Sequence, residues 1–444
     1  MDLNQIFNNT KLTENGDIAY SSTGDNLLDI LFMSEYYQHH LDEVHIGTSE
    51  EEKLFAMFMR DPRFGIGRRD LGRKLMHDTE CSIEQVVKAG RVDDLFYVPN
   101  GIEETYAVLD FLKKEIESGN ELVKKWMPRY SSKNLLLARY IAAYWGMNKQ
   151  QYGHFIKSNT TENKLSRKNY DDIDFEHVPS LAMIKYAHAF ATKPELSKRY
   201  AEYLEAVKAG KKDLKIATTT VYDIYRNQNT IDPDLFFSKI EKISGSWIPI
   251  VDTSGSMCDG NDSFGKALAL GHYLAKCSSY CPNSVVSFSS QPQLIELGKT
   301  LPERRSWYWH DAKSEDVASQ YRKEIASMFT GDCSNTDFGK VMDLLSKLDN
   351  YPEYLIVLSD MEFDCGSNSS KDKTMAMFKE RGANTKIIWW NLNPRHTTSP
   401  ETDAYGNIFL SGYNPLLLKF LEVGFDGKQF LNRLLDEYQK FIEK

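Results

Sequence analysis

The sequence contains no long apolar run and few cysteines. No hydrophobic stretch reaches the roughly 20 residues that a membrane-spanning helix needs. The first residues, MDLNQIFNNTKLTENGD, are polar and acidic, so we expect no signal peptide. The six cysteines among 444 residues include no CxxC pair. We therefore expect free thiols in the reducing environment of the cytoplasm, and no contact with a membrane.

The chain also lacks an excess of positive charge, because 54 Lys and Arg stand against 63 Asp and Glu, a formal net charge of −9. Any nucleic-acid site must then be a local basic patch. One candidate is residues 121–170, with ten Lys and Arg against two Asp and Glu, and another is the arginine-rich stretch 59–75. Clustered arginines suit phosphate. The alternatives are a solvated helix face for the first stretch and ion pairs with the acidic N-terminal region for the second.

Residues from about 28 to 240 have helical periodicity. In residues 102–119, apolar side chains recur every three or four positions and Gly119 is expected to end the helix. Residues 134–146 repeat this form, and Ser180 is a candidate N-cap. Short helices without intervening strands predict a stack of antiparallel helix pairs, although no strict sequence period is visible.

After about residue 241 the pattern changes to alternating strands and helices. The predicted strands are residues 247–252, 284–290, 354–360, 385–393 and 407–412. Continuous apolar strands alternating with helices predict a doubly wound, mostly parallel sheet. The expected fold class is thus α plus α/β, with a HEAT-like helical module in residues 1–240 and a Rossmann-like domain in residues 241–444. Ligands of such sheets bind at the carboxyl ends of the strands, where Asp252 and Asp360 are expected.

The stretch IPIVDTSGSMCDG places Asp252, Ser254 and Ser256 at alternate positions after a strand. A haloacid-type phosphotransferase would need a second aspartate at position 254. The stretch GNDSFGKA resembles a phosphate-binding loop, but Ala267 offers no hydroxyl and the match lies too far beyond the strand. A serine-hydrolase elbow is also absent. Oxygen-rich side chains of this kind fit a hard divalent cation such as Mg²⁺.

Three cysteines, Cys258, Cys333 and Cys365, fall near the predicted ligand-end loops. Their spacing contains no zinc-type pair, so a zinc site is the weaker alternative to a site built from oxygen ligands.

The pattern D-T-S-G-S at 252–256 resembles the metal-ion-dependent adhesion site (MIDAS) of von Willebrand factor A (vWA) domains. That family adds a threonine on a later loop and an aspartate after the fourth strand, and CSNTDFGK and VLSDMEF supply these as Thr336 and Asp360. The resemblance implies a Mg²⁺ ion, or Mn²⁺ or Ca²⁺, held by Asp252, Ser254, Ser256, Thr336 and Asp360. It further implies that the hydroxyls contact the ion directly or nearly so and that the aspartates often act through water.

The helical half resembles a TROVE module, the helical ring of the Ro autoantigen and its relatives, in DFEHVPSLAMIKYAHAF and RYAEYLEAVKAGKKDLKIATTTVYDIYR. The stretches STGDNLLDILF and KKWMPRYSSKN resemble an uncharacterised branch of this group, known from plants, fungi and large viruses or phages. In that branch a helical module also precedes a metal-site A domain. A viral or microbial source is therefore expected.

The resemblance implies a Ro-like RNA-binding scaffold, part of a ribonucleoprotein, whose partner is a small structured RNA. The candidate phosphate contacts are Arg68, Arg69, Arg73, Lys124, Lys125, Arg129, Lys133 and Arg139. We expect no enzyme activity, because no nucleophile–base pair is evident. The alternative is a protein-interaction module that captures a partner carboxylate through the metal site without binding RNA. A phosphoesterase that uses the same ion is a third, weaker possibility.

Overall fold

The chain divides into two compact units. The computed structural model describes residues 10–13, 15–98, 101–131, 133–216, 218–258, 261–288, 290–297, 336–393, 399–402 and 406–444. The unit that contains the sheet, called the sheet unit, comprises Met1–Val44, Arg63–Leu71 and Thr219–Lys444. The other, called the helical unit, comprises His45–Pro62 and Gly72–Thr218. The sheet unit thus includes segments that precede residue 241, where the sequence placed the domain boundary.

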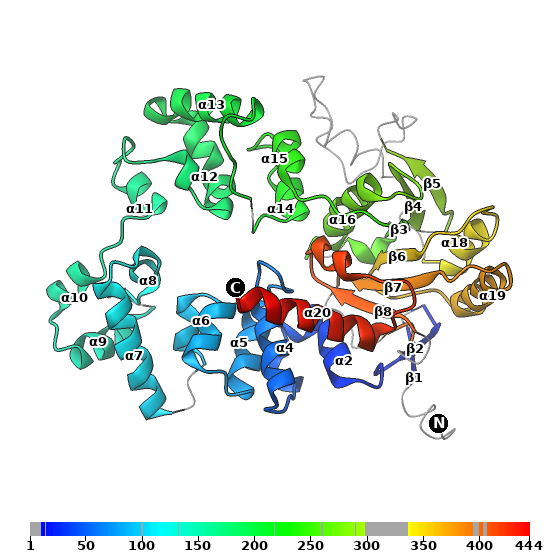
Figure 1. Cartoon of the computed structure of the whole chain (residues 1–444), viewed down its shortest axis with the longest axis horizontal. Helices are drawn as coiled ribbons and strands as arrows, with labels where there is room; N and C mark the ends of the chain where they lie inside the picture. Colours follow the sequence, from blue (N-terminus) through cyan, green and yellow to red (C-terminus); the bar gives the residue numbers. More distant parts are fainter. Residues whose placement is uncertain are drawn as a thin grey trace. The chain divides into compact units, whose positions relative to one another are not determined.

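Six strands form the central sheet in the order β5-β4-β3-β6-β7-β8 (Figure 1). Their bounds are β3 Trp247–Asp252, β4 Ser284–Phe288, β5 Gln293–Glu296, β6 Tyr354–Ser359, β7 Lys386–Asn391 and β8 Ile408–Ser411. All neighbouring pairs are parallel except β4 and β5, which are antiparallel. The mostly parallel sheet and the α plus α/β class are therefore confirmed. The edge strand β5 was not predicted, because only one of its four residues is buried and its apolar pattern is weak.

Helices cover both faces of this sheet. The core on one face joins Ile250, Val357 and Trp389 to side chains of α18 (Phe338–Leu345) and α19 (Ser367–Glu380). On the opposite face, Trp247 Nε1 donates to the Leu274 carbonyl of α16 (Ser263–Cys277) at 2.8 Å. Because successive strand residues point to opposite faces, burial on both sides requires the continuous apolar strands seen in the sequence.

The chain ends with two further elements. Residues predicted as a helix at PLLLKFLEVG form only the 3₁₀ helix η6 (Pro415–Phe420). The closing helix α20 (Gly427–Ile442) follows, as predicted, and begins with the N-cap Asp426, whose side chain accepts from Gln429 N. Phe64, from the arginine-rich stretch, stacks with Phe441 of α20 at a ring separation of 5.2 Å. This contact helps to hold residues 63–71 in the sheet unit.

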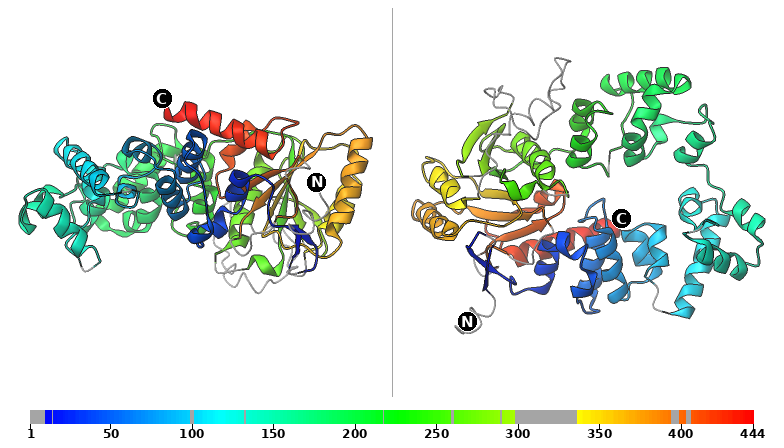
Figure 2. Two further views of the ribbon diagram at one scale, coloured as in Figure 1. Left: turned by 90° about the horizontal axis from the view of Figure 1, so that it is seen from below. Right: turned by 180° about the vertical axis from the view of Figure 1, so that it is seen from behind.

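The N-terminal region belongs to the sheet unit rather than to the helical module. Its elements are β1 Thr10–Leu12, β2 Ile18–Tyr20, α2 Asn26–Phe32, α3 Ser34–Tyr37 and the 3₁₀ helix η1 Leu41–Glu43. Helix α2 lies beside β8 (Figures 1 and 2), where the rings of Phe32 and Phe409 meet edge to face at 5.2 Å. Phe32 is fully buried in the core of the sheet unit. The amphipathic pattern of a helix does not show, from sequence alone, whether its apolar face packs in the core of the helical unit or in that of the sheet unit.

The helical unit contains short helices, as the periodicity predicted. They are α4 Glu50–Arg60, α6 Ile83–Ala89, η2 Val92–Phe96, α7 Ile102–Glu117, α8 Glu121–Trp126, α9 Leu135–Tyr144, α10 Lys149–Phe155, α11 Thr161–Ser166, η3 Phe175–His177, α12 Ser180–Thr192 and α13 Pro194–Lys208. Helix α5 (Arg69–Asp78) crosses the division between the units, whereas α14 (Val221–Arg226) and α15 (Pro233–Lys239) belong to the sheet unit. Ser180 is the first helical residue and Pro179 occupies the N-cap, which corrects the predicted cap.

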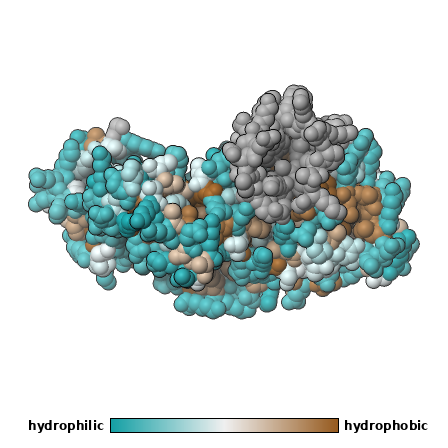
Figure 3. Space-filling view, turned by 90° about the horizontal axis from the view of Figure 1, so that it is seen from above, coloured by the Kyte–Doolittle hydropathy of each residue, from teal (hydrophilic) through white to brown (hydrophobic). Residues whose placement is uncertain are grey.

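The surface seen in Figure 3 is mostly hydrophilic, with hydrophobic residues gathered in separate patches. Among the helices of the described residues, none is both long enough and apolar enough to cross a bilayer.

Candidate functional site

Asp252 is the last residue of β3 and is completely buried. Its Oδ1 accepts from the backbone N of Ser254 at 2.9 Å, and its Oδ2 accepts a short hydrogen bond from Ser359 Oγ of β6. A buried carboxylate is costly unless its oxygens receive hydrogen bonds or a positive charge. These two contacts fix the orientation of the carboxylate at the carboxyl edge of the sheet.

The two serines of the motif lie together. Ser254 is buried, and its Oγ is 2.9 Å from the Oγ of Ser256, which is half-buried in the 3₁₀ helix η4 (Gly255–Met257). The backbone N of Thr253 donates to the Phe288 carbonyl at the end of β4, so the loop is anchored to the neighbouring strand. The alternation predicted from the sequence therefore brings both hydroxyls to one place beside Asp252.

Thr336 and Asp360 come from two loops that are tied to each other. Thr336 is buried directly before α18, and its carbonyl accepts from the backbone N of Asp364 at 2.8 Å. Asp360 follows β6, is 5% exposed, and its Oδ1 accepts from Glu362 N at 3.3 Å. Because β3 and β6 are parallel neighbours, Asp252 and Asp360 lie at the same edge of the sheet.

Burial, and then the charge of Asp360, raise the pKa of Asp252 to about 7, whereas hydrogen bonds from Ser254 and Ser359 lower it. Two close carboxylates with hydroxyl oxygens beside them form a donor set that suits a hard divalent cation. The described residues contain no group of three or more His, Cys, Asp or Glu that could hold a metal. A cation in this site would therefore depend on the hydroxyl oxygens, as the sequence pattern implied.

The positions of the cysteines do not support a zinc site. Cys258 and Cys365 are both exposed and form no disulfide, and Cys333 lies outside the described residues. As no zinc-type group occurs within the described part of the chain, the oxygen set is the better candidate.

Two features of the site escaped the sequence analysis. Ser359 orients Asp252, and its place directly before Asp360 at a strand end was the only signal that could have found it. The turn between β1 and β2 supports the loop after β6: Thr13 Oγ1 donates to the Phe363 carbonyl at 2.7 Å, and Asn15 Nδ2 donates to that of Glu362 at 3.1 Å. These contacts join residues about 350 positions apart, and no local sequence pattern predicts them.

The arginine-rich stretch separates into two groups, of which the first is a buried cluster in the helical unit. The Asp94 carboxylate forms ion pairs with the guanidinium groups of Arg60, at 2.8 Å, and Arg73, at 2.5 Å. Arg73 also pairs with the Asp93 carboxylate at 2.9 Å. All four residues are buried. At Gly72, a Cβ atom would approach the Cα of Arg60 to 2.7 Å, so glycine permits this close packing. Arg73 was predicted as a phosphate contact, but its guanidinium is enclosed and paired.

Arg68 belongs to the second group, in the sheet unit. Its Nη2 lies 2.6 Å from Glu35 Oε1, and both side chains are buried. Glu35 lies within the acidic N-terminal region, so this pair follows the alternative in which arginines neutralise that region. Arg69, the next residue, is exposed.

The predicted contacts in residues 121–170 differ in exposure. Lys124 and Lys125 are partly buried and pair with Glu121 at 2.9 Å and Glu162 at 3.5 Å. Arg129 is exposed but donates to the carbonyls of Ile156 and Lys124. Lys133 and Arg139 are exposed. Among the described residues neither of these last two has an ion-pair partner, so they are the best placed to meet a phosphate.

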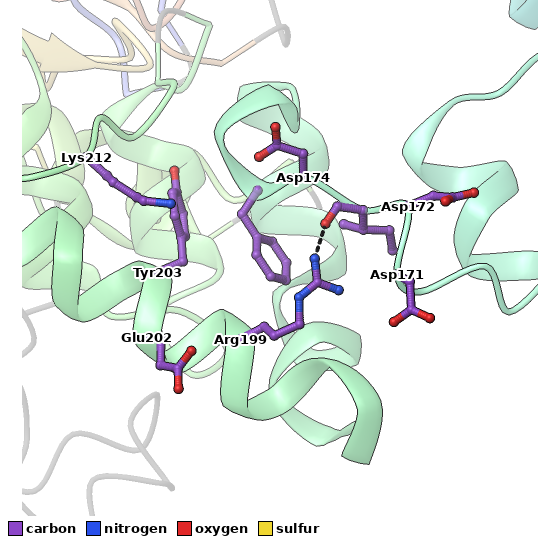
Figure 4. Close-up of a pocket in the computed structure, with 9 residues that line it drawn as sticks. Asp171, Asp172, Asp174, Arg199, Glu202, Tyr203 and Lys212 are labelled. Atoms are coloured by element: carbon purple, nitrogen blue, oxygen red, sulfur yellow. Dashed lines mark hydrogen bonds between the residues drawn. The ribbon is translucent and has the colours of Figure 1, made fainter.

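A hollow of about 380 Å³ in the helical unit is acidic (Figure 4). Its lining includes the carboxylates of Asp171, Asp172, Asp174 and Glu202, which outnumber the two cations Arg199 and Lys212. The Arg199 guanidinium donates to the Ile173 carbonyl at 2.8 Å. Four carboxylates would repel a phosphate backbone. This hollow is therefore no candidate for an RNA contact.

Comparison with known proteins gives two matches to family models. Residues 155–236 match a domain of unknown function, DUF2828, and residues 246–439 match another, DUF7788. A curated relative, an uncharacterised protein of Acanthamoeba polyphaga mimivirus, is 24% identical over 93% of this chain and 84% of its own length. The crystal structure of the Ro (RSR) protein of Deinococcus radiodurans aligns over 94% of this chain and 87% of that one, with a TM-score of 0.32 and 12% identity. At that TM-score the likeness carries no argument about function.

Proposed function

We propose that this chain is a non-catalytic binding scaffold whose sheet unit holds a divalent cation, Mg²⁺ or a similar ion. The observation that supports this most directly is the buried pair Asp252 and Asp360 at one sheet edge, with the hydroxyls of Ser254, Ser256 and Thr336 on adjoining loops. A divalent cation would offset the repulsion between the two carboxylates.

Such an ion would be suited to capture an acidic group. Three of the five candidate side chains are neutral hydroxyls, so the ion would keep much of its positive charge. Mg²⁺ commonly retains exchangeable water, which a carboxylate or a phosphate from a partner can displace. The sheet unit would then bind ligands through the ion rather than transform them.

A titration with Mn²⁺, followed by electron paramagnetic resonance, tests the cation site. We expect one strong site in the wild-type chain and its loss in Asp252→Asn, which keeps the shape of the side chain but not its charge. Asp343→Asn removes an exposed carboxylate of α18 and is the matched control. Unchanged Mn²⁺ binding in Asp252→Asn would refute the proposed site.

RNA is the partner class that the helical unit favours, and the supporting surface is on α9. Arg139 and Tyr140 are adjacent and exposed, Leu136 on the same helix is 80% exposed, and Lys133 precedes the helix. An exposed arginine can hold a phosphate, and an exposed aromatic ring on the same helix can stack on an unpaired base. This arrangement supports the Ro-like RNA-binding scaffold that the sequence resemblance implies.

Gel-shift measurements with a structured small RNA at several salt concentrations test this part. We expect binding that weakens as salt rises, and a smaller salt slope in Arg139→Gln. Lys347→Gln, an exposed position on the sheet unit, is the control. Binding without a salt slope would contradict the proposal.

The other candidate partner is a protein that offers a carboxylate to the ion, and the negative net charge of the chain favours it over a polyanion. A protein complex abolished by EDTA and by Asp252→Asn, together with no RNA shift at low salt, would select this candidate.

A further inference from the structure

The sheet unit contains a cavity whose lining residues are separate from the cation site. It has a volume of about 550 Å³ and is lined by residues of α3, the start of α5, α14, the start of α16 and the turn after β8. All its lining residues belong to the sheet unit. None of the five candidate cation ligands lines it.

Part of the lining is a buried ionic network centred on Glu35. Glu35 Oε1 lies 2.6 Å from Arg68 Nη2 and 3.8 Å from Lys266 Nζ, and Tyr413 donates a short hydrogen bond to the same oxygen. Arg68 and Lys266 also lie over the Tyr413 ring, at 5.5 and 4.8 Å from its centre. Two buried cations thus converge on one carboxylate oxygen at the cavity.

More positive charge comes from exposed side chains. Arg69 and Arg226 both line the cavity and are exposed, and Arg226 has no ion-pair partner among the described residues. The second carboxylate of the lining, Asp262, accepts from Tyr222 Oη at 2.8 Å and caps α16 by accepting from Gly265 N. The ionised lining groups are therefore four cations and two carboxylates, in a chain whose net charge is negative.

Charge and volume together define the ligand class. Arginine forks bind phosphate oxygens in a bidentate manner, and an excess of cations excludes a metal ion or a basic peptide. A volume of about 550 Å³ is much larger than a lone phosphate ion and lies within the range of small-molecule sites. We propose that this cavity binds a small organic phosphate of about the size of a nucleoside monophosphate.

Lys266 connects this proposal with the sequence. It is the lysine of GNDSFGKA, which fails as a phosphate-binding loop because Ala267 has no hydroxyl and because the loop lies too far beyond β3. The structure places Lys266 in the first turns of α16, where its ammonium meets Glu35 and Tyr413. Lys266 therefore lines the proposed phosphate cavity, but the other positive groups of this cavity are arginine side chains and not the backbone of a glycine-rich loop.

Calorimetric titration of the full chain with adenosine monophosphate, adenosine and inorganic phosphate tests the proposal. EDTA is present throughout, so that binding by a metal ion at Asp252 cannot contribute. We expect adenosine monophosphate to bind, inorganic phosphate to bind at least tenfold more weakly, and adenosine not to bind. Equal affinity for inorganic phosphate, or no binding of adenosine monophosphate at millimolar concentration, would overturn the proposal.

Single substitutions test whether adenosine monophosphate binds in this cavity. Arg226→Gln and Arg69→Gln should each weaken adenosine monophosphate binding about tenfold, the effect of one charged hydrogen bond. Arg167→Gln, which removes an exposed arginine of the helical unit, should leave the affinity unchanged. Because all three side chains are exposed, the variants should fold, and circular dichroism melts confirm that. Unaltered binding in both cavity variants would overturn the assignment. A negative result in these titrations would say nothing against the proposed cation site, because EDTA removes the ion from all of them.

Discussion

One arginine-rich stretch, residues 59–75, supplies two ionic clusters that differ in their balance of charge. In the helical unit, the two buried arginines Arg60 and Arg73 face two buried carboxylates, Asp93 and Asp94, in what we call the matched cluster. The partly exposed Arg91 also pairs with Asp93, at 3.1 Å. In the sheet unit, the two buried cations Arg68 and Lys266 converge on one buried carboxylate, Glu35, and this unmatched cluster borders a cavity. Clustered arginines are thus structural where carboxylates match them and available for an anion where cations are in excess.

The largest expected effect is on the matched cluster. Asp94→Asn removes the carboxylate that pairs with both Arg60 and Arg73. Arg73 keeps its pair with Asp93, whereas the buried Arg60 guanidinium loses its carboxylate. Breaking a buried pair in this way costs about 3–5 kcal/mol of unfolding free energy. Amide hydrogen exchange in η2 should increase accordingly, and urea unfolding of the helical unit should shift to lower concentration.

The control for this variant is Asp171→Asn, an exposed carboxylate of the same unit. It should change the free energy of unfolding by less than about 0.5 kcal/mol. A similarly small effect of Asp94→Asn would mean that the matched cluster is not structural.

The second prediction concerns the unmatched cluster. Glu35→Gln removes the charge shared by Arg68 and Lys266, and we expect a loss of about 1.5–3 kcal/mol, the range for hydrogen bonds to charged groups. Because this cluster borders a cavity, a bound anion can replace the carboxylate. Saturating adenosine monophosphate should therefore recover part of the melting temperature of Glu35→Gln. The gain in melting temperature should be larger for Glu35→Gln than for Asp94→Asn or wild type, and equal gains in all three would erase the difference between the clusters.

The acid dependence of stability gives a third, smaller effect. Burial raises the pKa of Glu35, but the charges of Arg68 and Lys266 outweigh this and hold it below the ordinary value near 4.5. A carboxyl with a lowered folded-state pKa contributes stability above its unfolded pKa, and that contribution is lost as the pH falls through the folded value. Unfolding measured at stepwise lower pH should therefore show the gap between wild type and Glu35→Gln closing below about pH 4.5. A constant gap down to pH 2 would contradict this.

Sequence reasoning predicted the mostly parallel sheet from local patterns, and it predicted the set of oxygen ligands from a local pattern together with the resemblance to a known motif. Continuous apolar strands indicated a mostly parallel sheet, and Asp252, Ser254 and Ser256 follow one strand at fixed spacing. The cation itself stays a prediction. The two arginine clusters could not be separated in this way, since Arg68 and Arg73 are five residues apart and enter different units. Their partners, Glu35 and Asp94, were selected by tertiary packing, which no local pattern encodes.

The smallest expected effect on stability is at the exposed part of the cavity. Arg226→Gln should change the unfolding free energy by less than about 0.5 kcal/mol, because the side chain is exposed and has no ion-pair partner among the described residues. The same change at Arg60, which is 3% exposed and pairs with Asp94 at 2.8 Å, should cost several-fold more. Thermal melts of the two variants side by side measure this ratio. Equal losses would show that Arg226 also stabilises the fold. The distinction between the matched and the unmatched cluster would then be wrong for Arg226, the residue for which it predicts a large effect on ligand binding and a small effect on stability.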